Sequence, residues 1–312
     1  MSPRCRVRGV FRAPILLGIA LWTVLALASF APRVHLGIIE ILFLLGPWFV
    51  VPLGADLIRS GGAPKDSALR DWVLFAAALL TTVSFFLDNR TAAAWFAGAW
   101  LLVCGAFAGD GLRRLVLRGT KSFAEFCFAI GEGYLLVAGV WLVASRAGVQ
   151  LLAFQEPIVL LTAVHFHFAG FASAVLAGLA DHAYVGHRGH RVLRAALLAV
   201  ILGPGILGLA FLLGPKVKLV AALLIAAGQL GLATGMLRIS IAAKSSSARW
   251  LLFVAAGSVA AGMVLAAVWA IGEYPLQAFV NIRQMAAFHG VLNAVGFVAC
   301  GLLGWTLLKQ IC

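Results

Sequence analysis

The amino-acid sequence predicts an all-α fold, a polytopic bundle of about ten transmembrane helices. Of the 312 residues, 63% are hydrophobic and only 11% are charged, and the mean hydropathy is +1.03. A water-soluble domain of this length cannot bury so much apolar surface, because too large a share of it stays at the boundary with water. The apolar residues also gather in runs long enough to cross a bilayer as helices. We therefore expect the whole chain, 1–312, to form one integral-membrane helical domain.

The first apolar run, 14–31, follows a basic start in which four of the first twelve residues are arginine. A basic segment before an apolar run that contains Ala26-Leu-Ala28 is also the pattern of a secretory signal peptide with a cleavage site. However, another apolar run follows after a few residues, and the loop between the two carries little positive charge. We therefore expect this segment to be kept as the first transmembrane helix.

Nine more apolar runs of spanning length follow, separated by short polar connections rich in Gly, Pro and charged residues. None of these connections is long enough to hold a soluble domain. Such interruptions of hydrophobicity mark the ends of membrane helices. The further predicted helices are 35–57, 70–87, 91–109, 123–145, 157–180, 192–213, 217–237, 249–271 and 284–307.

The distribution of lysine and arginine supports this helix count and sets the orientation. With the N-terminus inside, 18 of these residues fall on the inner side of the membrane and 6 on the outer side. Cytoplasmic connections carry such an excess, and a missing or extra helix would scramble the division. Both termini are therefore predicted to be cytoplasmic. The same rule accounts for the net charge of +13 without a nucleic-acid partner.

Several common functional motifs are missing from the sequence. The five cysteines are scattered and include no C-x-x-C, so neither a disulfide framework nor a zinc–cysteine site is indicated. The sequence has no Walker motif, no H-E-x-x-H and no nucleophile elbow. ATP-driven pumping, metalloprotease chemistry and serine hydrolysis therefore have no support in the sequence.

Two predicted helices contain helix-breaking residues. Gly46-Pro47 and Pro52 interrupt the second helix, and Gly203-Pro204 interrupts the seventh. Ten helices divide into two sets of five with opposite orientation, and paired interruptions at matching positions are typical of transporters built from inverted repeats. The alternative is that these residues only bend their helices, as Gly and Pro commonly do in membranes. Because no residue-level similarity relates the two halves, simple bending is the preferred interpretation.

Ionisable side chains inside the predicted helices are the candidate functional groups. Glu40, His165, His167 and His289 fall in the outer halves of their helices, and Glu132 falls near the middle of the fifth. A charged group at such depth costs about 2.5–3.5 kcal/mol on insertion scales, so it usually faces a bundle interior or a wet cavity. The similar depth of several such groups favours a shared site.

Helical spacing indicates which of the histidines can act together. His289 and Asn293 are four residues apart and share a helix face. His165 and His167 diverge by about 200°, so one regular helix cannot direct both at one ion. Metal or haem ligation and proton relay are the functional interpretations of His165, His167 and His289, since neutral imidazole suits both. The alternative is that these side chains form hydrogen bonds between helices that serve packing alone.

The acidic residues of the fifth helix follow the same logic. Glu125 and Glu132 lie about two turns apart on one face. Glu132 is either a proton carrier or a buried partner of a histidine that fixes helix packing. Glu125 lies nearer the inner interface, where we expect it to pair with Lys121 or Arg118. The histidines of the connection 181–190 are next to arginines that repel a cation, so a solvated loop is expected there.

Two segments resemble a known family. Thr162-Ala-Val-His-Phe-His-Phe-Ala-Gly-Phe171 and His289-Gly-Val-Leu-Asn-Ala-Val-Gly-Phe297 are similar to segments of the bacterial YndJ-like membrane proteins. The resemblance implies a multi-pass protein of the bacterial cytoplasmic (inner) membrane. It strengthens His165, His167, His289 and Asn293 as the distinctive positions, but it supplies no reaction.

Three functional hypotheses follow. The first is a proton- or ion-coupled transporter of a small solute or ion, in which Glu132, Glu40, Asn293 and the histidines relay protons or bind substrate. The second is a membrane-embedded oxidoreductase that holds a metal or haem through His165 or His167 and His289. The third is a non-catalytic scaffold in the lipid bilayer. The sequence favours the transporter, which is not an enzyme, because the sequence contains no complete set of metal or haem ligands.

Overall fold

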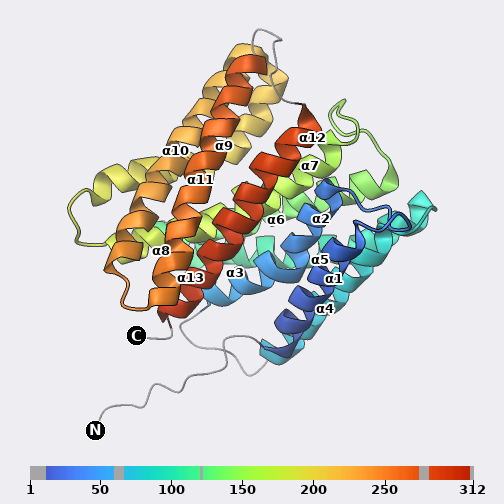
Figure 1. Ribbon diagram of the computed structural model, residues 1–312, viewed down its shortest axis with the longest axis horizontal. Helices are drawn as coiled ribbons and strands as arrows, with labels where there is room; N and C mark the ends of the chain where they lie inside the picture. Colours follow the sequence, from blue (N-terminus) through green and yellow to red (C-terminus); the bar gives the residue numbers. More distant parts are fainter. Residues whose placement is uncertain (1–11, 60–66, 120–121, 274–280, 310–312) are drawn as a thin grey trace.

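The computed structural model describes residues 12–59, 67–119, 122–273 and 281–309. Within these ranges the chain is almost entirely helical, and its one β-type contact is an isolated bridge between Leu151 and Phe154. The predicted all-α class is therefore confirmed. Figure 1 shows the helices packed into one bundle, with α9, α10 and α11 on one side and α1, α4 and α5 on the other.

Every one of the ten predicted segments is helical. The helices of the first half are α1 (Ala13–Ala28), α2 (Ile38–Leu45), η1 (Gly46–Val50), α3 (Val51–Ile58), α4 (Ser67–Ser84), α5 (Arg90–Arg118) and α6 (Phe123–Ala147). Those of the second half are α7 (Ile158–His165), η2 (Phe166–Ala172), α8 (Ser173–Tyr184), α9 (His190–Leu213), α10 (Pro215–Ala242), α11 (Ser246–Glu273), α12 (Ile282–Met285), η3 (Ala286–Gly290), η4 (Leu292–Ala299) and α13 (Cys300–Lys309).

Several of these elements join end to end, and eight helices of the described chain are long and apolar enough to cross a membrane. Three of the eight are composite: Ile38–Ile58, Ile158–Tyr184 and Ile282–Lys309. The two predicted segments outside the eight are α1, which has 16 residues, and α4, which carries Arg70 and Asp71 near its start. A polytopic helical membrane protein is thus confirmed.

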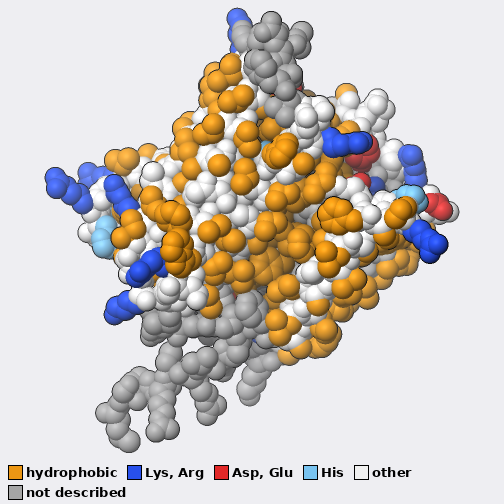
Figure 2. All heavy atoms as spheres, viewed as in Figure 1, with side chains coloured by type: hydrophobic (Ala, Val, Ile, Leu, Met, Phe, Trp, Pro, Cys, Tyr) orange, Lys and Arg blue, Asp and Glu red, His pale blue; other side chains and the backbone are white. Residues whose placement is uncertain are grey.

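The composite helices form the centre of the bundle, and they contact one another. Of the most apolar window of Ile38–Ile58, 83% is buried inside the protein. The red ribbon of Ile282–Lys309 runs between the two outer groups of helices in Figure 1. Figure 2 shows many hydrophobic side chains across the visible face of the bundle, with the charged side chains near its edges, as expected of a lipid-facing exterior.

Each central helix contains π-helical turns: η1 in the first, η2 in the second, and η3 with η4 in the third. The η1 turn contains Pro47, which has no N–H for the regular i to i−4 bond. The other π-helical turns contain no proline. The second predicted helix is therefore irregular, as expected, but the sixth and tenth are irregular too.

The seventh predicted helix, by contrast, stays continuous through Pro204 in α9. The Tyr134 hydroxyl of α6 donates to the Ile201 carbonyl (2.8 Å) and accepts from the Gly205 N–H (3.1 Å). It thus joins the two backbone groups that a regular helix would bond directly. The irregular helices are the second, sixth and tenth, so their positions do not match the paired pattern of an inverted repeat.

One helix boundary affects the functional site. The fourth predicted helix, 91–109, ended before the charged residues. In the structure this helix, α5, continues to Arg118 and is followed by Gly119 at φ +62°. Arginine and leucine are good helix formers, so the helix continues beyond its most apolar part. Asp110 and Arg114 are therefore helical residues, one turn apart on the same face.

Candidate functional site

The central helices touch at their π-helical turns, and His167 lies at this junction. Its side chain is fully buried, its Nδ1–H donates to the Ala163 carbonyl (2.8 Å), and its Nε2 accepts from the Trp100 indole N–H (2.9 Å). Phe43 packs edge-on against the ring at 5.2 Å between centroids. Gly46 lies so close that a Cβ there would be 3.1 Å from the imidazole Cδ2. Both ring nitrogens of a neutral His167 are thus satisfied.

His165 and His289 have the opposite character, because one ring nitrogen of each has no hydrogen-bond partner among the described residues. The Nδ1–H of His165 donates to the Leu161 carbonyl (2.7 Å), and that of His289 donates to the Gly262 carbonyl (2.9 Å). Because a carbonyl can only accept, the proton lies on Nδ1, and Nε2 carries a lone pair in both rings. The two rings lie within electrostatic range of each other. His165 and His167 therefore have different surroundings, as their angular separation predicts.

Asn293 completes this group on the same face as His289. Its amide nitrogen donates to the His289 carbonyl (2.7 Å). The amide also packs against Gly262 of α11, so closely that a side chain at position 262 would collide with it. The contact of 3.3 Å between the Asn293 nitrogen and His289 Nδ1 is not a second hydrogen bond, because that nitrogen already carries the proton given to Gly262.

Glu132 pairs with an arginine rather than with a histidine. Arg114 of α5 contacts Glu132 (Nε to Oε2, 3.2 Å) and Glu125 (Nη1 to Oε2, 2.7 Å). Glu132 is only 1% exposed. The close approach of α5 and α6 that brings Arg114 to Glu132 depends on Gly111. A Cβ at this position would be 2.7 Å from the Ala129 carbonyl oxygen and 3.0 Å from the Glu132 Cβ.

Of the two interpretations of Glu132 left open by the sequence, the structure does not show the pair with a histidine, because the partner of this carboxylate is Arg114. For Glu125, the partner we find is Arg114, while the predicted partners, Lys121 and the side chain of Arg118, lie outside the part of the chain that the structure describes. The sequence analysis missed Arg114 because it placed that residue in a loop. The spacing of Asp110 and Arg114 by one helical turn was the available signal.

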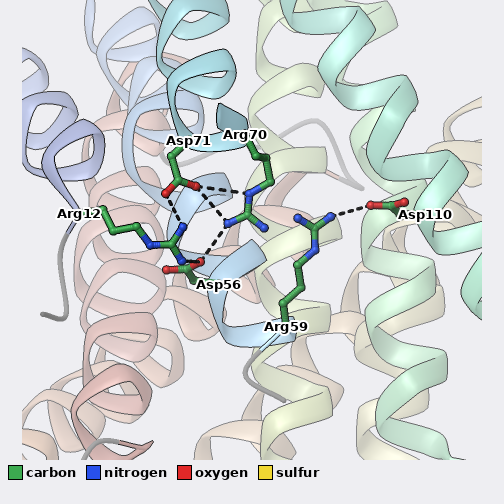
Figure 3. Close-up of polar contacts among 6 residues, drawn as sticks. All are labelled: Arg12, Asp56, Arg59, Arg70, Asp71 and Asp110. Atoms are coloured by element: carbon green, nitrogen blue, oxygen red, sulfur yellow. Dashed lines mark hydrogen bonds and ion pairs between the residues drawn. The ribbon is translucent and has the colours of Figure 1, made fainter. Parts of the chain in front are cut away.

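A larger group of ion pairs surrounds the same end of the bundle. Figure 3 shows Arg12 and Arg70 between Asp56 and Asp71. Arg12 pairs with Asp56 (2.7 Å) and with Asp71, and Arg70 pairs with Asp56 (3.0 Å) and Asp71 (3.1 Å). These contacts join the start of α1, the end of α3 and the start of α4. None of the four was predicted as a site residue.

Two more contacts continue this end of the bundle. Arg59, just after α3, pairs with Asp110 of α5 (2.6 Å), also visible in Figure 3. Buried Asp181 of α8 accepts from His190 Nε2 (2.6 Å) and Arg194 Nε (2.7 Å) of α9. His190 is thus a helix residue with a buried partner, not part of a solvated loop. We call this end, which holds Arg12, Arg59, Arg114, Arg194 and Arg238, the arginine-rich end.

Glu40 lies far from this end, in the first turn of α2. Arg59 follows the same composite helix 19 residues later, which corresponds to about 28 Å of helix. Near Glu40 is Arg146, whose guanidinium stacks on Phe85 at 4.4 Å and whose buried Nε has no hydrogen-bond partner within the described ranges. The polar groups expected to share one site therefore lie in separate parts of the bundle. Glu132 belongs with the arginine-rich end, and Glu40 lies near the opposite end.

Among the described residues, no group of three or more His, Cys, Asp and Glu side chains could hold a metal ion. The two free Nε2 atoms of His165 and His289 are the histidine lone pairs that such an ion could use. A ligand at His167 would first have to displace Trp100.

Comparison with known proteins gives the family. A model of the YndJ-like protein family matches residues 41–297, which is most of the chain. The uncharacterized membrane protein YndJ of Bacillus subtilis (strain 168) is 27% identical over 185 residues, which is 59% of this chain and 33% of that relative. The match thus spans about a third of the relative's length. No solved structure matches. This multi-pass membrane protein therefore belongs to the YndJ-like family.

Proposed function

We propose that this protein is a proton- or ion-coupled transporter of the bacterial cytoplasmic membrane, oriented with its arginine-rich end inside. The observation that carries the proposal is the meeting of three π-interrupted helices at the centre of the bundle. Single π-helical turns are frequent at functional sites. Irregular backbone within a membrane is tolerated only inside protein or beside a water-filled cavity.

The solute site in this proposal lies beside His165, His289 and Asn293. Both free Nε2 atoms accept hydrogen bonds, so they suit a cation or a solute with N–H or O–H donors. The side chain of His165 is exposed and that of His289 is partly exposed, so both are accessible to a ligand. Such a site would be reached from the side opposite the arginine-rich end.

Glu132 and its ion pairs supply the coupling in this proposal. Protonation of Glu132 would release Arg114, which also holds Glu125, and would weaken the link between α5 and α6. Asp110 and Arg59 lie within electrostatic range of Glu132, so the change would reach α3. In this proposal, the ion pairs hold the arginine-rich end closed until Glu132 is protonated.

The test is proton flux into proteoliposomes that contain a pH-sensitive dye and face an imposed pH gradient. We expect flux above that of empty liposomes, its loss in E132Q, and normal flux in the control E273Q. Glu273 is a suitable control because it also pairs with one cation, Lys218 (2.8 Å), but at the opposite end. A folded wild-type protein with no flux under any gradient contradicts the proton-coupled transporter.

A membrane-embedded metal- or haem-dependent oxidoreductase is the second candidate. It is favoured by the Nδ1–H to carbonyl bonds of His165 and His289, the arrangement in which metal-bound histidines are usually held. An absorption spectrum with metal analysis distinguishes the two. A stoichiometric metal or haem signal that is lost in H165A/H289A supports the oxidoreductase, and a colourless, metal-free folded protein contradicts it.

A further inference from the structure

The arginine-rich end has two halves that treat their positive charges differently. In the half formed by α1, α3, α4, α5 and α6, four arginines pair with carboxylates: Arg12, Arg59, Arg70 and Arg114. In the half formed by α8 to α11, five exposed cations have no carboxylate partner among the described residues. We call these the basic patch: Arg188, Arg191, Arg238, Lys244 and Arg249.

The sequence explains why the basic patch stays unpaired. Between Glu156 and Glu273 the chain has eight Lys and Arg residues but a single acid, Asp181. That carboxylate is buried and already accepts from His190 and Arg194. Glu273, the last residue of α11, lies at the opposite end of the bundle and pairs with Lys218. The counter-charge for the basic patch must therefore come from outside this half of the protein.

The five cations belong to one surface. Arg238 of α10 donates to the Tyr184 hydroxyl at the end of α8 (3.0 Å), which brings the α8–α9 and α10–α11 connections side by side. Figure 2 shows Lys and Arg side chains along the left edge of the molecule, over these connections, with no acidic side chain on that edge. Arg249 donates to the Ala243 carbonyl (2.7 Å), which leaves its charge unneutralised.

Apolar side chains around the basic patch show what kind of surface this is. Trp250 is 62% exposed beside Arg249, Val192 is 76% exposed beside Arg191, and Ile241 is 69% exposed near Lys244. Exposed tryptophan next to lysine and arginine at the end of a spanning helix is typical of the headgroup level of a membrane. A nucleic acid or a soluble anion would not be expected to contact such an apolar border.

We propose that the basic patch binds the phosphate groups of anionic phospholipids. Arginine matches phosphate geometry with paired N–H donors, and lysine adds a point charge. The bound lipid would supply the negative charge for the basic patch, because Asp181 is buried and already paired with His190 and Arg194. This inference does not depend on the proposed transport function, because it uses neither the histidines nor Glu132.

The experiment compares lipid binding by the full chain in detergent micelles, using native mass spectrometry with phosphatidylglycerol and phosphatidylcholine. The variant R188Q/R191Q/K244Q removes three charges of the basic patch and leaves Arg238 and Arg249, which bond to the protein. The matched control R33Q/K216Q/R283Q removes three exposed charges at the opposite end. We expect preferential phosphatidylglycerol binding that weakens about a hundredfold in the patch variant and is unchanged in the control.

Competitors separate the sources of phosphate. Inorganic phosphate and a short RNA at equal charge concentration should not displace phosphatidylglycerol. Displacement by either, equal loss in both variants, or no preference over phosphatidylcholine would overturn the proposal. Circular dichroism and thermal unfolding in phosphatidylcholine verify that both variants are folded before they are compared.

Discussion

Both halves of the arginine-rich end carry many arginines, but most of those on the α1–α6 side have carboxylate partners, whereas the α8–α11 side has a single acid, Asp181. On the α1–α6 side, Arg12, Arg59 and Arg114 each join two or more helices through carboxylates. On the α8–α11 side, Arg188 and Arg191 are exposed and have no such partner in the part of the chain that the structure describes. The positive-inside rule accounts for both groups. The placement of the acids decides which arginines stabilise the fold.

The largest expected effect is that of Arg114→Ala. It leaves Glu132 buried without a partner, and removal of one member of a buried pair costs about 3–5 kcal/mol of stability. Thermal unfolding in detergent measures the loss. The double variant R114A/E132Q should recover part of it, because the buried group is then neutral. Equal stability of R114A and wild type would contradict the structural role of this pair.

The ion-pair group of Figure 3 gives the next effect. Asp71→Asn takes the charge from a side chain that is 4% exposed and faces Arg12 and Arg70. We expect a loss of about 2–3 kcal/mol, since hydrogen bonds to charged buried groups are the costly ones to lose. Asp88→Asn, at the exposed opposite end, is the control and should have no measurable effect. A similar loss in both variants would show that the effect is not specific to the ion pairs.

The close approach of α5 and α6 can be tested without touching a charge. Gly111→Ala places a methyl group 2.7 Å from the Ala129 carbonyl oxygen, so the helices must separate. Overpacking of this kind costs about 1–3 kcal/mol. Gly109→Ala is the matched control on the same helix, because a Cβ there meets no atom within 4 Å. The prediction fails if the two alanine variants unfold at the same temperature.

The smallest expected effect on stability is that of a substitution in the α8–α11 half. Arg191→Ala should change stability in phosphatidylcholine by no more than about 0.5 kcal/mol, as is usual for an exposed side chain away from specific contacts. The same thermal unfolding assay measures it. A loss as large as that of Arg114→Ala would remove the distinction between the two halves.

The sequence was most informative where hydrophobicity alone decides. All ten helical segments were located, because a run of apolar residues cannot remain in water. The separate directions of His165 and His167 also followed from helix geometry. The candidate roles of these histidines and of Glu132 in transport remain predictions.

What could not be predicted depends on contacts between distant parts of the chain. The charges of α5 suggested a loop, although the helix continues for two more turns and brings Arg114 to Glu132. The π-helical turns at Phe166–Ala172 and Leu292–Ala299 contain no proline, so composition gave no sign of them. They are set by how the central helices fit against one another.

The π-helical turns also have a consequence for how the central helices could rearrange. A π turn holds one residue more than an α turn, so moving that extra residue by one position along a helix shifts the residues it passes by about 1.5 Å along the axis and rotates them by about 100°. In Ile282–Lys309, His289 lies within η3, and Val291 separates η3 from η4. We expect a rearrangement of η3 to rotate His289 away from the Gly262 carbonyl, whereas α13 would keep the bond from Lys309 to the Leu57 carbonyl.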